Sequence, residues 1–172
     1  ALVHRAYHAL PPLSTDYGEL VNAVFGFSSI LLKILKELKP DYLAATFDLA
    51  GPTFRHKEFE GYKAKRVKAP DELYSQIKRV KEVLAAFNIP IYEKEGFEAD
   101  DIIGTLVRLA SRYKNLEIII ATGDLDALQL VDEKTKVFTL KKGIKDTIFY
   151  DVEAVKKRFG GLKPEQMPDF KG

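Results

Sequence analysis

The chain has 172 residues, of which 46% are apolar and 30% are charged, and 27 basic residues nearly balance 25 acidic ones to give a net charge of +2. This length and composition predict a single ordinary globular domain and exclude a disordered chain, while the small net charge gives no whole-chain argument for binding nucleic acid. The absence of cysteine excludes disulfides, thiolate metal sites and cysteine nucleophiles. No apolar run approaches the roughly 18 residues of a membrane-spanning helix, so we do not expect a membrane protein.

Helices and short strands alternate along the first half of the chain. Apolar residues at three-and-four spacing predict a helix over 16–39, which Pro40 ends. The uncharged run 42–47 predicts a strand that is buried on both faces and closed by Asp48. Residues 49–69 show neither helical nor strand periodicity, and connections of this length are usually functional or mobile.

The second half continues the alternation. Pro70 opens another helix, and the run 89–92 after it predicts a short edge strand. A further helix is expected from about 98 to 113, followed by the clearest buried strand of the sequence at 116–121. The remaining predicted elements are two weaker strands near 136–140 and 147–150 and a last helix that begins at Asp151. Strands that alternate with helices predict the α/β class, with a mostly parallel sheet covered on both faces.

Acidic residues gather where the predicted strands end. Asp48 follows one strand, Asp124 and Asp126 follow another, and Glu98, Asp100 and Asp101 begin a helix. Ligands of parallel sheets bind outside the carboxyl ends of the strands, so we expect carboxylates from three segments to converge. Crowded carboxylates need cations to offset their repulsion, and oxygen ligands favour Mg²⁺ or Mn²⁺. Two such ions roughly 4 Å apart would suit phosphodiester hydrolysis.

A structural role is the alternative for each acid taken alone. A single aspartate at a strand end is commonly a helix N-cap, and acids in a first helical turn commonly stabilise the helix dipole. The joint occurrence of acids at successive strand ends is what favours the metal site.

Charge is segregated along the chain although the total is small. Residues 53–68 carry six Lys or Arg against two Glu, whereas 93–101 carry five acids against one Lys. The basic segment also carries four rings, those of Phe54, His56, Phe59 and Tyr62. Cations for phosphates and rings for stacking bases are typical of single-stranded nucleic-acid binding, with a solvated surface loop as the alternative.

Four motifs stand out along the chain: Thr46-Phe-Asp-Leu-Ala-Gly-Pro-Thr-Phe-Arg-His56, Gly61-Tyr-Lys-Ala-Lys-Arg66, Gly96-Phe-Glu-Ala-Asp-Asp-Ile-Ile-Gly104 and Thr122-Gly-Asp-Leu-Asp-Ala-Leu-Gln-Leu130. Together with the segments 4–11 and 142–151 they resemble the 5′ nuclease domain of bacterial DNA polymerase I, and the resemblance runs through nearly the whole chain. It implies one domain over 1–172 with the PIN-like three-layer sandwich of the flap endonucleases. The sheet would be mostly parallel, and residues 49–69 would contribute to a helical arch.

The resemblance also implies roles for individual residues. Asp48, Glu98, Asp100, Asp101, Asp124 and Asp126 match metal-binding acids, for two Mg²⁺ or Mn²⁺ ions. Lys63 and Arg66 match arch cations that hold the scissile phosphate, with Arg55, His56, Tyr62 and Lys65 as further DNA contacts. The implied activity is 5′-3′ exonuclease and structure-specific flap endonuclease cleavage in replication and repair, on DNA with a 5′ flap or a 5′ end at a duplex junction.

The resembled family extends beyond this chain at both ends. Its members begin with a buried strand that ends in an aspartate, before the segment matching 1–11, and continue past residue 172 into a helix-hairpin-helix region and a polymerase. We therefore expect a truncated domain of a bacterial, cytoplasmic and nucleoid-associated protein. Two alternatives are a catalytically incomplete DNA-binding fragment and a PIN-type ribonuclease, which shares the fold and acids but does not need the arch motif.

Overall fold

The computed structural model describes residues 1–64, 69–143 and 146–171, with Lys142 and Lys171 described by their backbone alone. Its elements, in chain order, are α1 (Leu2–Ala9), α2 (Asn22–Leu38), β1 (Ala45–Thr46), α3 (Phe54–Glu58), α4 (Asp71–Ala86), β2 (Ile91–Tyr92), α5 (Ala99–Ala110), β3 (Ile118–Ala121), the 3-10 helix η1 (Leu125–Leu130), β4 (Thr135–Lys142), β5 (Asp146–Tyr150), α6 (Val152–Arg158), the 3-10 helix η2 (Pro164–Gln166) and α7 (Met167–Lys171). This alternation confirms the predicted α/β class. Within the described residues, no helix is both long enough and apolar enough to cross a membrane.

The described strands form two ladders. β1 pairs in parallel with β2, and β3 pairs in parallel with β4, which pairs in an antiparallel manner with β5. Parallel pairing prevails as predicted, but β1 and β3 share no ladder among the described residues. The predicted strand 42–47 is reduced to Ala45–Thr46, and Tyr42 at its expected start is 83% exposed rather than buried.

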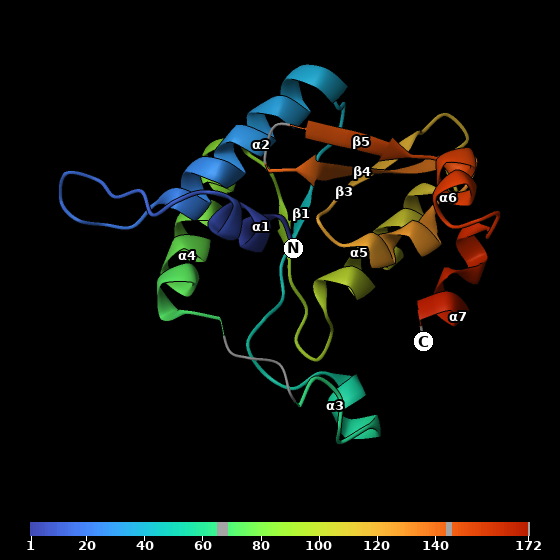
Figure 1. The fold of residues 1–172 in the computed structure, drawn as a ribbon, viewed down its shortest axis with the longest axis horizontal. Helices are drawn as coiled ribbons and strands as arrows, with labels where there is room; N and C mark the ends of the chain where they lie inside the picture. The colour runs from blue at the N-terminus through green and yellow to red at the C-terminus, as the bar shows by residue number, and fades with distance from the viewer. Residues whose placement is uncertain (65–68, 144–145, 172) are drawn as a thin grey trace.

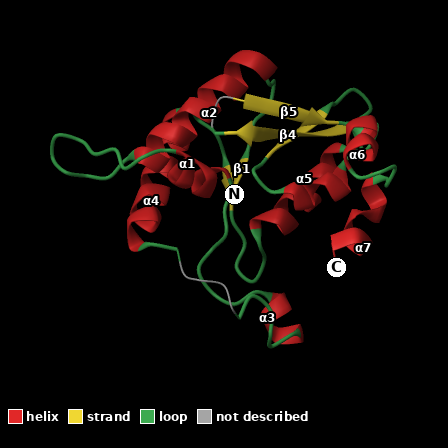
Figure 2. Cartoon of the chain, viewed as in Figure 1, coloured by secondary structure: helices red, strands yellow, loops and turns green. Residues whose placement is uncertain are grey.

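The strands lie between two groups of helices (Figure 1). α1, α2 and α4 pack together on one side, and α5, α6 and α7 lie on the other, as the colouring by element type also shows (Figure 2). Side chains alternate along β4: Phe138 and Leu140 join a cluster with α1 and α2, whereas Val137 joins one with η1 and α6. A strand covered on both faces needs this alternation of apolar side chains, and it produces the expected three layers.

α2 begins at Asn22, later than the predicted start near Asp16, because the residues before it form a hairpin. The N–H of Val21 donates to the carbonyl of Leu13 (2.7 Å), and the hairpin projects from the body of the molecule (Figure 1). Gly18 in its turn has φ +79°, a left-handed conformation that suits glycine. The apolar spacing therefore predicted the helix correctly but placed its start too early.

The N-terminus of α2 is capped from α4. Gln76 is 1% exposed, and its Oε1 accepts the N–H groups of Ala23 (2.7 Å) and Val24 (3.3 Å). Its Nε2 donates to Asn22 Oδ1 (3.1 Å), and Asn22 Nδ2 donates to the carbonyl of Tyr7 in α1 (2.9 Å). This buried amide satisfies donors that a helix leaves unpaired at its first turn, and it ties three helices together.

The long connection 49–69 is described as far as residue 64 and contains the short helix α3, which the sequence did not predict. Figure 1 shows α3 apart from both groups of helices and close to the loop that leads into α5. The N–H of Phe54 donates to the carbonyl of Gly96 (3.0 Å), and the rings of Phe54 and Phe97 lie 5.6 Å apart. The basic segment is thereby docked beside the acidic start of α5.

Candidate functional site

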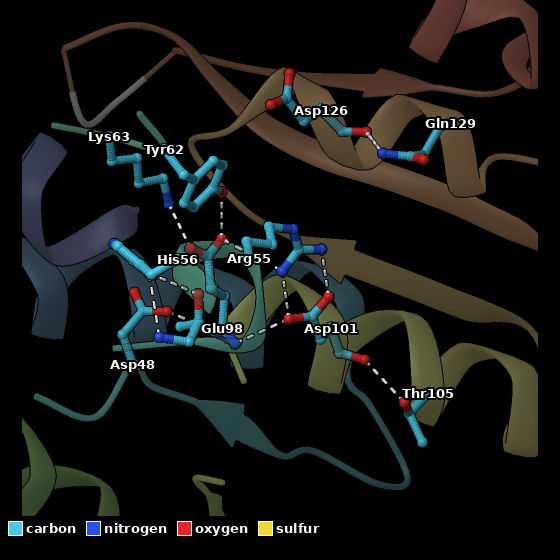
Figure 3. Close-up of polar contacts among 12 residues, drawn as sticks. Asp48, Arg55, His56, Tyr62, Lys63, Glu98, Asp101, Thr105, Asp126 and Gln129 are labelled. Atoms are coloured by element: carbon cyan, nitrogen blue, oxygen red, sulfur yellow. Dashed lines mark hydrogen bonds and ion pairs between the residues drawn. The ribbon is translucent and has the colours of Figure 1, made fainter. Parts of the chain in front are cut away.

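The predicted acids come from the ends of three elements. Asp48 follows β1, Glu98, Asp100 and Asp101 lie at the start of α5, and Asp124 and Asp126 follow β3. Asp48 Oδ1 accepts the N–H of Ala99 (2.7 Å), which joins the end of β1 to the start of α5. Figure 3 shows Asp48, Glu98 and Asp101 close to one another, with Asp126 apart from them.

Two of the acids build the N-terminus of α5. Glu98 is the N-cap residue, and its own N–H donates to Asp101 Oδ2 (2.9 Å). The Glu98 side chain in turn accepts the backbone N–H of Asp101. This reciprocal capping box satisfies N–H groups that have no partner within the helix, so the structural role considered for these acids is present.

Cationic and phenolic groups of the basic segment bind the same two carboxylates. Arg55 donates from Nη1 to Asp101 Oδ2 (2.8 Å) and from Nη2 to Asp101 Oδ1 (2.7 Å). Lys63 Nζ donates to Glu98 Oε1 (2.8 Å), and the Tyr62 hydroxyl donates to Glu98 Oε2 (3.1 Å). Figure 3 shows these three side chains converging on Glu98 and Asp101. The segment predicted to bind phosphates thus contacts the acids in this structure.

Asp100 lies within the influence of acids from all three segments. Desolvation raises its pKa, and the carboxylates of Asp124, Asp48 and Glu98 raise it further, against a lowering effect of the amino group of Ala1. After desolvation, the neighbouring carboxylates are the second cause of this rise, so negative charge from three segments acts on Asp100. Negative charge of this kind favours the binding of a divalent cation.

Asp101 and Lys63 are stabilised in their charged forms. The hydrogen bonds from Arg55 hold the pKa of Asp101 below its usual value. Desolvation lowers the pKa of Lys63, but its hydrogen bonds with Glu98 and Tyr62 outweigh that effect and the pKa is raised. Arg55 and Asp101 therefore meet as an ion pair at neutral pH, and Lys63 meets Glu98 as a cation.

Asp124 and Asp126 begin η1. Asp124 Oδ1 accepts the N–H of Asp126 (2.9 Å), so Asp124 serves as an N-cap. The N–H of Asp124 donates to the Thr122 hydroxyl (3.1 Å), and Gln129 Nε2 donates to the Asp126 carbonyl (3.0 Å). The Asp126 side chain is exposed. These contacts fix the loop that follows β3.

The other predicted site residues lie on the basic segment. His56 Nδ1 accepts the N–H of Thr53 (3.1 Å), and its ring meets that of Tyr62 edge-on at 5.2 Å. His56 is therefore held by its own segment. Lys65 and Arg66, predicted as a DNA contact and a phosphate-binding cation, lie outside the described residues.

The donor set fits Mg²⁺ or Mn²⁺ in its chemistry, because every acid offers carboxylate oxygens. Across residues 1–64, 69–143 and 146–171, however, no group of three or more His, Cys, Asp or Glu side chains is arranged to hold a metal ion. Instead, Asp101 forms an ion pair with Arg55, and Glu98 forms one with Lys63. The convergence of six acids on metal ions stays a prediction.

The sequence did not predict the pairing of Arg55 with Asp101, because the two residues are 46 positions apart. Arg55 was expected to contact DNA and Asp101 to bind metal. The complementary charge of the segments 53–68 and 93–101 is the signal that points to such a pair.

Comparisons with known proteins place the chain among related sequences and folds. Residues 1–160 match the family described as 5′-3′ exonuclease, N-terminal resolvase-like domain. The chain is 46% identical over 176 residues to DNA polymerase I of Chloroflexus aurantiacus, an alignment that covers 100% of this chain and 18% of that protein. The chain thus spans less than a fifth of the length of that relative.

Two solved structures of bacteriophage T5 proteins share the fold. One, co-crystallised with metal ions, has a TM-score of 0.72 and 16% identity, and covers 96% of this chain and 60% of that chain. The other, a flap endonuclease in a complex with DNA and metal ions, has a TM-score of 0.64 and 16% identity, and covers 83% of this chain and 54% of that chain. At such identities the likeness extends to the fold, which is PIN-like.

Proposed function

Since the chain belongs to the family of 5′-3′ exonuclease N-terminal, resolvase-like domains, we propose that it is a divalent-metal-dependent 5′ nuclease that hydrolyses DNA phosphodiesters. The observation that carries the proposal is the docking of a basic, aromatic segment on the acids at the start of α5, to which Asp48 at the end of β1 is also hydrogen-bonded. Acids that attract cations and a segment that attracts phosphates are the two parts that metal-assisted phosphodiester hydrolysis requires.

Asp48, Glu98, Asp100, Asp124 and Asp126 are proposed to hold two Mg²⁺ or Mn²⁺ ions. Bound there, the ions would lower the pKa of a water molecule and offset the charge of the phosphate. The support from the structure is the pKa of Asp100, which desolvation raises first and the carboxylates of Asp124, Asp48 and Glu98 raise further. Asp48 also links the end of β1 to α5 through Ala99, which keeps two of the segments together.

Lys63 and Arg66 are proposed to bind the scissile phosphate. In this structure Lys63 donates to Glu98, and a phosphate oxygen is an equivalent anionic acceptor for its ammonium group. Arg55, His56, Tyr62 and Lys65 belong to the same segment and are proposed to contact the DNA strand. Rings among cations allow bases to stack while their phosphates are neutralised.

The substrate is proposed to be DNA with a 5′ flap or a 5′ end at a duplex junction, and residues 49–69 are proposed to form the arch of a single domain. The relative named above is a DNA polymerase I, of which this chain matches 18%. We propose accordingly that a polymerase region accompanies this domain in a bacterial cytoplasmic protein of replication and repair.

The test is cleavage of a labelled 5′-flap DNA by the protein in Mg²⁺, with Ca²⁺ and EDTA as comparisons. Cleavage is expected in Mg²⁺ and should be abolished by the double substitution Asp100→Ala, Asp124→Ala. Arg79→Gln is a matched control, because Arg79 pairs with Glu19 and Glu82, neither of which is a predicted site acid, and its loss should leave the rate unchanged. Undiminished cleavage by the double variant would refute the proposed site.

One observation favours a second candidate, a DNA-binding domain without catalysis. Among the described side chains, none of the acids is grouped with two others as a metal site would require. Flap affinity and cleavage measured side by side separate the two functions, because binding without cleavage in Mg²⁺ supports the second. A ribonuclease function would instead appear as faster cleavage of RNA flaps than of DNA flaps.

A further inference from the structure

We propose that Asp101 is a positioning residue that acts through Arg55 to hold the segment 53–63 against the start of α5, and that it is not a metal ligand. The proposal rests on the proposed nuclease function for its kinetic test alone. The role proposed for Asp101 differs from the metal-binding role that the resemblance of its motif implies.

Both carboxylate oxygens of Asp101 already have donors. Oδ1 accepts Arg55 Nη2 at 2.7 Å, whereas Oδ2 accepts Arg55 Nη1 at 2.8 Å and the N–H of Glu98 at 2.9 Å. A planar guanidinium that donates to both oxygens fixes the carboxylate in distance and direction. To bind a metal ion, Asp101 would have to give up part of this pair or the cap of its own helix. Glu98 also has donors on both oxygens, but these come from Lys63 and Tyr62, which are proposed to turn to the DNA and would then leave Glu98 free for an ion.

The neighbouring acid faces a different environment. Successive residues of an α-helix point about 100° apart, so Asp100 and Asp101 cannot serve the same partners. Of the two, Asp101 is the acid that meets Arg55, and the Ala99 N–H next to Asp100 donates to Asp48 Oδ1 at the end of β1 (2.7 Å). The basic segment is thus docked through Asp101.

Arg55 lies where the basic segment docks on the body of the protein. Its guanidinium lies 4.6 Å from the centre of the Phe54 ring, and Phe54 is bound to the 96–97 loop by a backbone hydrogen bond and a ring contact. Farther along the segment, Tyr62 and Lys63 reach Glu98. The pair of Arg55 with Asp101 therefore sets the point from which Lys63 reaches the site.

The pair is only partly buried, with 33% of the Arg55 side chain and 21% of the Asp101 side chain exposed. An ion pair at such a position contributes little to global stability but can fix the conformation of the segment that carries it. Loss of the pair should therefore alter the placement of residues 54–63 while the rest of the fold stays intact.

The kinetic test is a double-mutant cycle on single-turnover cleavage of 5′-flap DNA. We expect Asp101→Asn and Arg55→Gln each to lower the rate roughly tenfold, and the double variant to be no slower than either, because coupled residues have non-additive effects. The Mg²⁺ concentration for half-maximal rate should not change in Asp101→Asn. Arg79→Gln is the matched control, since Arg79 also donates two hydrogen bonds to one carboxylate, Glu19 (2.9 and 3.3 Å). Additive losses would overturn the coupling.

Two further measurements do not need catalysis. Calorimetric titration with Mn²⁺ should give the same affinity for Asp101→Asn as for the unchanged protein, whereas Asp124→Asn should weaken binding. An equal weakening by Asp101→Asn would make Asp101 a ligand and overturn the proposal.

Hydrogen exchange of residues 54–63 should become faster in Asp101→Asn and Arg55→Gln but not in Arg79→Gln. If the unchanged protein cuts no flap, the nuclease function fails, while unaltered exchange in both variants would separately overturn the positioning role.

Discussion

Lys63 donates a hydrogen bond to Glu98 and offers a test of how the basic segment acts. We expect Lys63→Ala to slow single-turnover flap cleavage by roughly 100-fold, because a cation on the reacting phosphate acts mainly in the transition state. The affinity for the flap should fall far less. Lys57→Ala is a control from the same segment, since Lys57 lies on α3 and is exposed. Equal losses in rate and affinity would show that Lys63 only helps to bind DNA.

The pKa values of Asp100 and Asp101 are shifted in opposite directions. In metal-free protein, we therefore expect the two residues to make the free energy of unfolding depend on pH in opposite ways. Desolvation and neighbouring carboxylates raise the pKa of Asp100 above its ordinary 3.8, so the folded state holds its proton more tightly. Its contribution to stability is therefore present at low pH and is lost as the pH rises through the folded pKa. The pKa of Asp101 is lowered by Arg55, so its contribution is present above 3.8 and is lost as the pH falls through the folded pKa.

We therefore expect Asp100→Asn to stabilise the protein at pH 7 in EDTA and low salt, and Asp101→Asn to destabilise it. Both differences should shrink toward pH 3, where the carboxyl groups are increasingly protonated in the folded and unfolded states. Urea unfolding at pH 3, 5 and 7 measures the sign of each effect. A destabilised Asp100→Asn at pH 7 would contradict the crowding of acids around Asp100.

At the level of residues, the sequence located the acids but not their partners. Strand ends and the Gly96–Gly104 motif predict that Asp48, Asp100 and Asp124 lie together, and that grouping stays a prediction, because among the described residues no three acids are arranged to hold an ion. The attachment of Arg55 to Asp101 depends on how the long connection 49–69 folds back, and no local pattern encodes such a contact.

At the level of elements, Gln76 shows how helix packing supports the layer beside the strands. Gln76→Ala removes the acceptor of the Ala23 and Val24 N–H groups in a buried place, which should cost about 1–3 kcal/mol in the free energy of unfolding. Ser75→Ala is the matched control, because Ser75 is exposed on the same helix and bonds only within it. Urea unfolding of both variants measures the difference. Equal small effects would show that the amide is not a cap.

The periodic elements could be predicted and the aperiodic ones could not. α2 and α4 carry apolar residues at helical spacing, which any amphipathic helix needs, and both occur, although α2 begins at Asn22 rather than near Asp16. α3 has no buried residue and is held by contacts with the loop before α5, so its helix leaves no apolar stripe in the sequence. The strand at 42–47 was predicted too long because apolar character alone does not show where a partner strand ends.

For the whole molecule, α2 connects the two ladders. Its side chains join the cluster around β1 and α4 through Phe27 and Leu31, and the cluster around β4 through Ile30 and Ile34. Asp48 lies after one ladder and Asp124 after the other, so the proposed acidic site would span the junction between them. A ligand that binds both acids would therefore stabilise the fold as a unit.

This junction predicts that divalent ions stabilise the entire protein. An ion that binds the folded state at 100 times its Kd adds about 2.7 kcal/mol, which for a domain of this size raises the Tm by roughly 5–10 °C. Differential scanning calorimetry in Mn²⁺, against NaCl of equal ionic strength, measures this shift. The double variant Asp100→Ala, Asp124→Ala should lose the shift, because its acids from α5 and the loop after β3 are gone. If Mn²⁺ gives the unchanged protein no rise in Tm beyond that in NaCl, an ion site between the ladders is contradicted. An ion that binds the folded protein must raise its free energy of unfolding.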